Sequence, residues 1–309
     1  MTDPDHDEYA AYTSLAEAQD DNRWAFGTGF SDPLAGVDTT LPEGVAGPDL
    51  AAYCLMLGDD ALVMSQRLSE WLTHAPELEE EVALANVGLD LLGQARLLLA
   101  RAAAADPSVV PALPEGSPVP PEDTLAYFRD DPDFRCVRLV ERRDDDFAEC
   151  VGRLLVFATW RLAVLDALRD STDNVLAAVA RKGVPEVTYH RDYAARWVHT
   201  LGLGTDESSR RMQAALVTIW PLLPELFATH ATEAAVAAAG AGVDPARVED
   251  DVRGTLRQVL AESGLDEPEV PGMGPVSGRT GRDGVHTEEL SHTLAEMQSV
   301  ARAHPEGRW

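Results

Sequence analysis

Four long segments of this chain repeat apolar residues at the spacing of an α-helix, and no other feature constrains its fold as strongly. The segments cover residues 48–73, 77–104, 144–169 and 173–202. With a rise of about 1.5 Å per residue, helices of this length form rods of about 35–40 Å. No stretch of useful length alternates apolar and polar residues as a half-buried strand does. The sequence therefore predicts an all-α protein.

The number and length of these rods are typical of a ferritin-like four-helix bundle. Pro185 lies inside the fourth segment, where its missing N–H predicts a kink or a break. Asp173 or Thr172 is expected to cap the start of that helix. Additional C-terminal helices are predicted over residues 206–230, 249–262 and 287–304.

Residues 1–45 differ in composition from the rest of the chain. An acidic stretch is followed by glycines and prolines, which predicts a loosely ordered N-terminal arm with a short helix at 9–20. Residues 46–309 form the predicted ferritin-like helical domain. Within it, the proline-rich stretch 105–121 shows no helical period and is expected to be a long surface connection.

The charge balance excludes two classes of partner. The chain has 53 acidic and 25 basic residues, which gives a formal net charge of −28 at pH 7. Nucleic acids and anionic membranes both require basic patches, so we expect neither as a partner. The chain opens without a secretory signal pattern, and no apolar run reaches the roughly 20 residues that span a bilayer. These features predict a cytoplasmic protein.

The three cysteines, Cys54, Cys136 and Cys150, are odd in number, far apart and outside any C-x-x-C pair. This spacing favours neither a disulfide framework nor a zinc site. Because their neighbours are apolar, we expect three reduced, buried thiols.

The only lysine of the chain, Lys182, lies four residues before Glu186, and His190 follows four residues later. On one helix these side chains stack along a face, and the preceding apolar stretch predicts that this face is buried. A carboxylate and an imidazole inside a helix bundle raise the question of a di-metal site. A lysine at the same place argues against it, because an ammonium group and a metal ion compete for the same carboxylate.

The chain lacks a complete di-iron ligand set. Such a centre requires a Glu from each of two helices and a Glu-x-x-His from each of two others. The one Glu-x-x-His is Glu289 to His292, in the last predicted helix. No nucleophile motif or phosphate-binding glycine loop is present either. From the residues alone we assign no catalytic residue and no metal ligand.

Several strings taken together resemble the C-subunit family of ring 1,2-phenylacetyl-CoA epoxidases. The resemblance runs from about residue 48 to Trp309. The strings are Tyr53–Asp60, Ser65–Trp71, Leu89–Arg96, Glu186–His190, Arg210–Leu216, His286–Glu288 and Leu294–Gln298.

This resemblance implies a ferritin-like subunit of a complex that inserts one oxygen atom of O₂ into the aromatic ring of phenylacetyl-CoA. In that family the A subunit holds the di-iron centre, and a reductase passes electrons from NADPH through flavin and iron–sulfur centres. The C subunit pairs with the A subunit as a structural, non-catalytic partner, so no cofactor is expected in this chain. Further small subunits and the reductase are implied as additional partners.

The resemblance leads to a hypothesis about the interior. Lys182 and Glu186 would occupy the former metal position as an ion pair, with His190 beside them. Asp60, Asp90 and Asp146 are the candidates for additional carboxylates there. One competing interpretation is a free-standing di-iron carboxylate oxidase or oxygenase that uses His190 and His292. Another is a ferritin-like scaffold without any link to an oxygenase.

Overall fold

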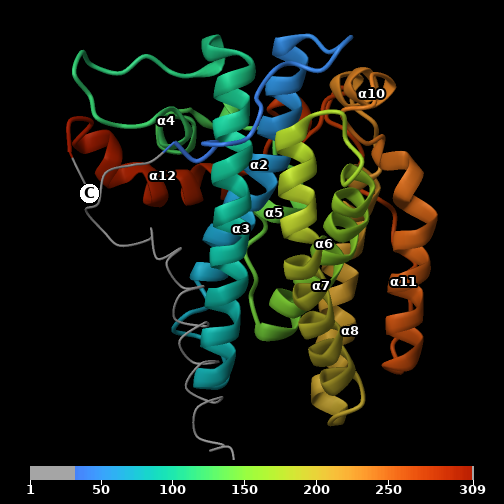
Figure 1. The fold of residues 1–309 in the computed structure, drawn as a ribbon. Helices are drawn as coiled ribbons and strands as arrows, with labels where there is room; N and C mark the ends of the chain where they lie inside the picture. The colour runs from blue at the N-terminus through green and yellow to red at the C-terminus, as the bar shows by residue number, and fades with distance from the viewer. Residues whose placement is uncertain (1–31, 308–309) are drawn as a thin grey trace, which may run out of the picture.

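The computed structural model describes residues 32–307, and Figure 1 shows that this part of the chain is built from helices. The described residues contain no β-strand, only an isolated bridge between Val276 and Arg279. The predicted all-α class is therefore confirmed. The helix predicted at residues 9–20 lies outside the described part. The four long helices are α2 (Gly47–Ser69), α3 (Leu78–Ala105), α6 (Phe147–Leu168) and α7 (Asn174–Gly202).

These four helices form a bundle of two hairpins (Figure 1). Helix α2 packs along α3 and α6 packs along α7, while contacts between α3 and α7 join the two hairpins. Short connections place consecutive helices antiparallel. Helix α6 is buried on nearly every side, because apolar residues such as Leu154, Phe157 and Val164 surround its axis.

The remaining helices cover two opposite sides of the bundle (Figure 1). Helices α8 (Asp206–Ile219) and α11 (Glu249–Glu262) pack on α6 and α7. On the other side, α12 (Glu288–Ala303) packs on α2 and on the short helix α4 (Pro121–Tyr127), which lies against α3. The smaller elements are η1 (Pro107–Val109), η2 (Asp131–Asp133), α5 (Arg138–Glu141), η3 (Trp220–Leu222), α9 (Leu223–Leu226), α10 (Ala231–Ala238), η4 (Pro245–Val248) and η5 (Gly281–Asp283).

Prolines affect the helices in two ways. The helix predicted over 206–230 is interrupted after Ile219, where Pro221 and Pro224 introduce a 3₁₀ turn and the short α9. Helix α7, in contrast, continues through Pro185 without the break that was one of the expected outcomes. Because Pro185 has no N–H, the carbonyl of Arg181 has no hydrogen-bond donor within the helix. Both residues lie on the exposed side of α7, so water can donate to that carbonyl instead.

Helix α3 also exposes apolar surface. In the described part of the chain it is the one unbroken helix long and apolar enough to cross a bilayer by composition, which was not expected from the sequence. Here it packs in the bundle against α2 and α7. Leu78, Val82 and Leu89 nevertheless stay exposed, by 70%, 53% and 50%.

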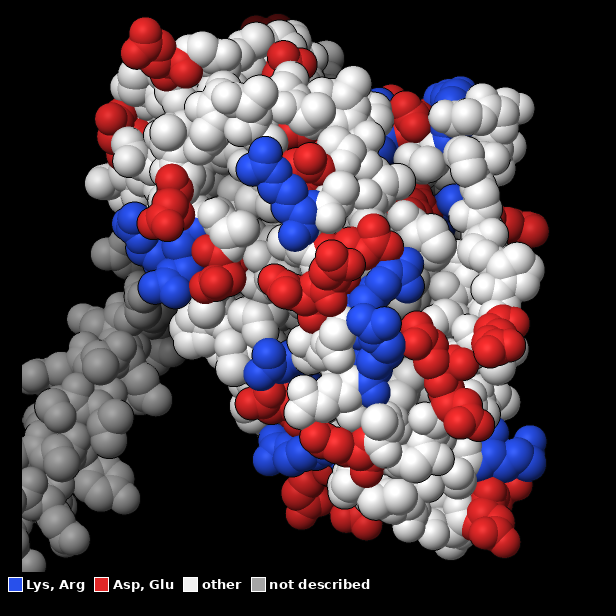
Figure 2. All heavy atoms as spheres, turned by 90° about the vertical axis from the view of Figure 1, so that its right-hand side faces the viewer, with Lys and Arg blue, Asp and Glu red and all other residues white. Residues whose placement is uncertain are grey.

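Charge is mixed on the face that carries α11. Figure 2 shows Lys and Arg side chains there next to groups of Asp and Glu, with no continuous basic surface on this face. The view agrees with the expectation, based on net charge, that nucleic acid is not a partner.

Asp123 on α4 provides a test of how burial affects stability. Burial raises the pKa of this half-buried carboxyl from 3.8 to about 6, and the neighbouring Glu122 adds to the rise. Its neutral form therefore stabilises the fold below about pH 4, and this contribution is lost as the pH rises through about 6. We expect Asp123→Asn to raise the free energy of unfolding at pH 7 by about 1–2 kcal/mol, after allowance for partial exposure. In urea titrations the gain should disappear near pH 4; a gain that is independent of pH would contradict this explanation.

Candidate functional site in the bundle interior

His190 lies where α7 packs on α3. Its side chain is buried, and Nε2 lies 3.0 Å from Oδ2 of Asp90, which is 38% exposed. From the sequence, His190 was expected beside the Lys182–Glu186 pair, and Asp90 was one of three candidates for an additional carboxylate there. The structure brings these two together.

Gln94 links three helices beside this pair. Its Nε2 donates a hydrogen bond of 2.9 Å to Oε2 of Glu186 on α7. Its Oε1 accepts a hydrogen bond of 2.9 Å from Nε of Arg161 on α6. Burial raises the pKa of Glu186, and the hydrogen bond from Gln94 acts in the opposite direction. One neutral amide therefore lies between a carboxyl group and a guanidinium.

Arg161 places a cation in the bundle interior, next to Gln94. It is 1% exposed, and NH1 donates to the carbonyl of Leu57 over 3.2 Å. NH2 is buried and has no hydrogen-bond partner among the described residues. Burial lowers the pKa of this guanidinium to about 10, although the Asp60 carboxylate acts in the opposite direction. A positive charge thus lies among the four long helices, in the region where bundle metal sites are built.

Asp60 is fully buried on α2 and pairs with a different arginine. Both its oxygens accept hydrogen bonds of 2.9 Å from Arg282, and Oδ1 also accepts one of 2.8 Å from the Val137 N–H. Burial raises the pKa of Asp60, and the Arg282 guanidinium opposes that rise. Glu233 lies 3.8 Å from Nε of the same arginine. Asp60 is therefore a buried carboxylate, but its cation comes from the connection before α12 and not from the predicted group around Lys182 and Glu186.

The predicted buried ion pair between Lys182 and Glu186 is not formed. Lys182 is exposed, and within residues 32–307 no ion pair joins it to Glu186. Each step of four residues advances a side chain by about 40° around a helix, so a stack of three spans about 80°. His190 is therefore buried, Glu186 lies at the boundary and Lys182 reaches solvent.

Asp146 is not an interior carboxylate either. It caps α6, where Oδ1 accepts a hydrogen bond of 3.0 Å from the Glu149 N–H. This position lies at the helix end because the acidic run before Phe147 belongs to the connection. The predicted role of Asp146 in the interior site was wrong.

Glu289 and His292 lie on α12, away from His190. The His292 side chain is 67% exposed and lies 3.8 Å from Glu288. Glu289 contacts Arg67, and α12 packs on α2, α4 and α5. The ligand pair required by the free-standing di-iron interpretation is therefore not assembled, because the two histidines lie on helices that do not share a site.

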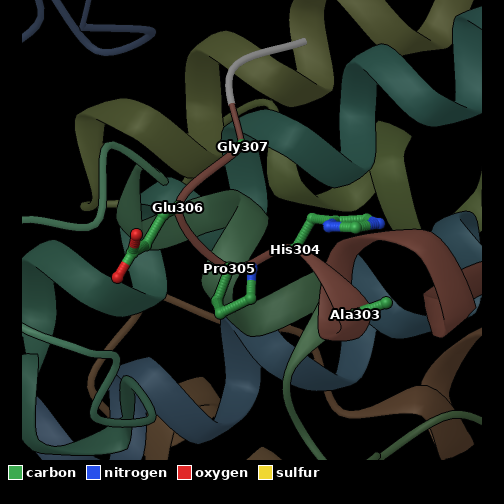
Figure 3. Close-up of a pocket in the computed structure, with 5 residues that line it drawn as sticks. All are labelled: Ala303, His304, Pro305, Glu306 and Gly307. Carbon is green, nitrogen blue, oxygen red and sulfur yellow. The ribbon is translucent and has the colours of Figure 1, made fainter.

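The surface hollows do not suggest a second site. One of about 500 Å³ is lined only by Ala303 to Gly307, and Figure 3 shows His304 and Glu306 pointing in opposite directions there. Another of about 570 Å³ lies between the end of α2 and α12, and it includes Trp71 and His292. The second is lined by charged side chains that already form ion pairs, as Arg67 does with Glu70 and Glu289.

Arg161 was not predicted as an interior cation. A signal was present, because Arg161 follows Leu154 and Ala158 at helical spacing and precedes Leu165 on the same face. An arginine in that register of an apolar helix must either be paired or remain poorly solvated.

Two comparisons with known proteins show which family this chain belongs to. A family model described as "Phenylacetic acid catabolic protein" matches residues 38–309. The chain is 40% identical over 261 residues to the C subunit of 1,2-phenylacetyl-CoA epoxidase from Escherichia coli (strain K12). That alignment covers 84% of this chain and 99% of the relative. The matches confirm the resemblance read from the sequence strings, and with it the ferritin-like fold class.

Proposed function

This chain belongs to the phenylacetic acid catabolic protein family, and on that basis we propose that it is a structural, non-catalytic subunit of a 1,2-phenylacetyl-CoA epoxidase complex. It would act in aerobic phenylacetate degradation, in the cytoplasm. Its main partner would be the ferritin-like A subunit, which holds the di-iron centre. Electrons would come from a reductase with flavin and iron–sulfur centres, with further small subunits in the same complex.

The observation that carries this proposal is the guanidinium of Arg161 among the four long helices. Its Nε is bound to Gln94, which also binds Glu186. A di-iron centre in such a bundle is held by carboxylates and imidazoles that neutralise the metal charge. Here an amide and a permanently charged arginine lie among the helices that would supply those ligands. The arrangement suits packing and support of a partner rather than binding of iron.

The exposed residues Leu78, Val82 and Leu89 of α3, together with Tyr189 of α7, form the apolar face on which we expect the A subunit to dock. Leu78 and Val82 are four residues apart and Leu89 follows seven residues later, so all three share one side of α3. Tyr189 belongs to the same region, because its ring packs at 6.5 Å from His190, the partner of Asp90. An obligate pair of this kind buries over about 2,000 Å² of surface.

A charged residue on the apolar face should prevent docking. We expect Leu89→Asp to weaken binding of the co-expressed A subunit at least about 30-fold, because an unpaired carboxylate would be buried in an apolar contact. Pull-down at graded concentrations measures the change. Val300→Asp is the matched control, since Val300 is also exposed but lies on α12. Equal retention of the partner by Leu89→Asp and the wild type would place the interface elsewhere.

Reconstitution tests the proposed function itself. This chain and the A subunit are purified separately and then mixed with the reductase, NADPH, O₂ and phenylacetyl-CoA. We expect epoxide formation only when both bundle proteins are present, with the iron accompanying the A subunit. Turnover by this chain with the reductase alone would overturn the proposal and favour the free-standing oxygenase.

A further inference from the structure

A buried cluster of potential metal ligands lies outside the bundle interior, between α5 and the start of α12. Sγ of Cys136, Oε1 of Glu141 and Nδ1 of His286 lie within 4.8 Å of one another. The sulfur is 3.9 Å from the carboxylate oxygen and 4.0 Å from the ring nitrogen. The nitrogen and the oxygen are 2.6 Å apart. Cys136 and Glu141 are fully buried, and the His286 side chain is 4% exposed.

The remaining atoms of these ligands are held by neighbouring groups. His286 Nε2 lies 2.9 Å from the Phe134 carbonyl, to which it donates its N–H. Glu141 Oε2 accepts hydrogen bonds of 2.7 Å from both the N–H and the hydroxyl of Thr287. Metal-binding histidines and carboxylates are oriented by this kind of contact. Nδ1, Oε1 and Sγ are the atoms left to face a common point.

We propose that Cys136, Glu141 and His286 bind one zinc ion. Zinc accepts sulfur, nitrogen and oxygen ligands in a tetrahedron, and three protein ligands leave one position for water. Ideal bonds of about 2.0–2.3 Å separate tetrahedral ligand atoms by about 3.3–3.6 Å. Two of the observed ligand-atom separations are longer than this range and one is shorter. Side-chain shifts of less than about 1 Å would therefore bring all three atoms within bonding distance of one ion. The inference departs from the sequence expectation, which searched only for cysteine pairs.

The charges at the cluster suit a divalent ion. A thiolate at Cys136 and the Glu141 carboxylate together neutralise it, and the imidazole adds no charge. The nearby carboxylates have partners of their own. Asp59 is paired with Arg129 and accepts the Arg135 N–H, and Asp60 is paired with Arg282. The ion therefore replaces the hydrogen bond between His286 and Glu141 without disturbing those pairs.

The location gives the site a structural role and a route of entry. It would link the connection before α6 to the segment before α12, across 145 residues between Glu141 and His286. Residues 283–287 are only half-buried. An ion would therefore reach the cluster past this segment and not through the bundle.

Cobalt substitution tests the site on the isolated full-length chain. After treatment with a chelator, Co²⁺ is titrated and absorption is recorded. We expect one Co²⁺ per chain, a thiolate-to-cobalt charge-transfer band in the near ultraviolet, strong visible bands of tetrahedral Co²⁺, and displacement by one equivalent of Zn²⁺. Absence of the thiolate band in the wild type would by itself overturn the proposal.

Two cysteine variants locate the ion. Cys136→Ser should remove the charge-transfer band and weaken Co²⁺ binding at least about 10–100-fold. Cys150→Ser is the matched control, because Cys150 is equally buried but lies on α6 outside the cluster, and it should retain the band. A band that persists in Cys136→Ser would refute the site. Circular dichroism of each variant verifies its fold, and the experiment does not depend on the A subunit.

Discussion

Replacing Arg282 by methionine is expected to lower the free energy of unfolding by about 3–5 kcal/mol. Arg282 binds both oxygens of Asp60 and also donates to the carbonyls of Met56 and Arg135. Methionine fills similar space but leaves the buried Asp60 without a cation, with Glu233 close by. The loss should appear in urea unfolding as a lower midpoint with an unchanged slope.

Arg161→Met is the matched comparison, because both arginines are buried in the same region. Within the described residues no carboxylate forms an ion pair with Arg161, and its NH2 has no partner. Removal therefore leaves no unpaired charge, and methionine avoids the desolvation of the guanidinium. We expect a change within about 1 kcal/mol of the wild type, in either direction. Equal losses for the two variants would contradict the distinction between a paired and an unpaired arginine.

A double-mutant cycle measures the interaction energy between Asp60 and Arg282 separately from the contacts that each makes with other residues. In Asp60→Asn the amide oxygen can still accept the Val137 N–H, while the charge is gone. Combined with Arg282→Met, the total loss should be smaller than the sum of the two single losses by about 1–3 kcal/mol. Additive losses would mean that the two side chains do not stabilise each other.

Asp173→Ala is expected to be at least as damaging as Arg282→Met, with a loss in the free energy of unfolding of about 4–6 kcal/mol. Oδ1 of Asp173 accepts the Leu176 N–H and so caps α7. Oδ2 accepts hydrogen bonds from Nε and NH2 of Arg101, which is fully buried. Alanine removes the cap, a loss of about 1 kcal/mol, and leaves a buried guanidinium without its carboxylate, a loss of about 3–5 kcal/mol.

Two control variants separate the contribution of the helix cap from that of the ion pair with Arg101. Asp173→Asn keeps a capping oxygen, so it should be less damaging than alanine by about 1 kcal/mol. Thr205→Ala removes an exposed cap from α8, where no buried charge is involved, and should lower stability by only about 1 kcal/mol. A loss in Asp173→Ala no larger than that in Thr205→Ala would show that the Arg101 pair contributes nothing.

Helical periodicity made most of the fold predictable. The segments over 77–104 and 173–202 became α3 and α7 with bounds shifted by a residue, and Asp173 caps α7 as expected. The helix predicted over 206–230 begins at Asp206 as expected but ends at Ile219, because apolar spacing continues across Pro221 and Pro224 whereas backbone hydrogen bonding does not. Helix α7, in contrast, continues through its single proline, Pro185.

The interior site was less predictable, because it depends on angles around helices and on contacts between distant segments. The predicted burial of Lys182 was wrong, because each step of four residues rotates a side chain by about 40° around the helix axis. The partner of Asp60 is Arg282, 222 positions away on a connection that no periodic pattern positions. Cys136, Glu141 and His286 meet for the same reason, across connections rather than along one helix.

Iron loading of the isolated chain tests most directly whether protein charge has taken the place of iron in this bundle. The full-length chain is incubated anaerobically with excess Fe²⁺ and desalted, and its iron is then measured beside that of the A subunit treated identically. We predict far less than one iron per chain here and about two per A subunit. About two irons per copy of this chain, abolished by His190→Ala, would contradict the account.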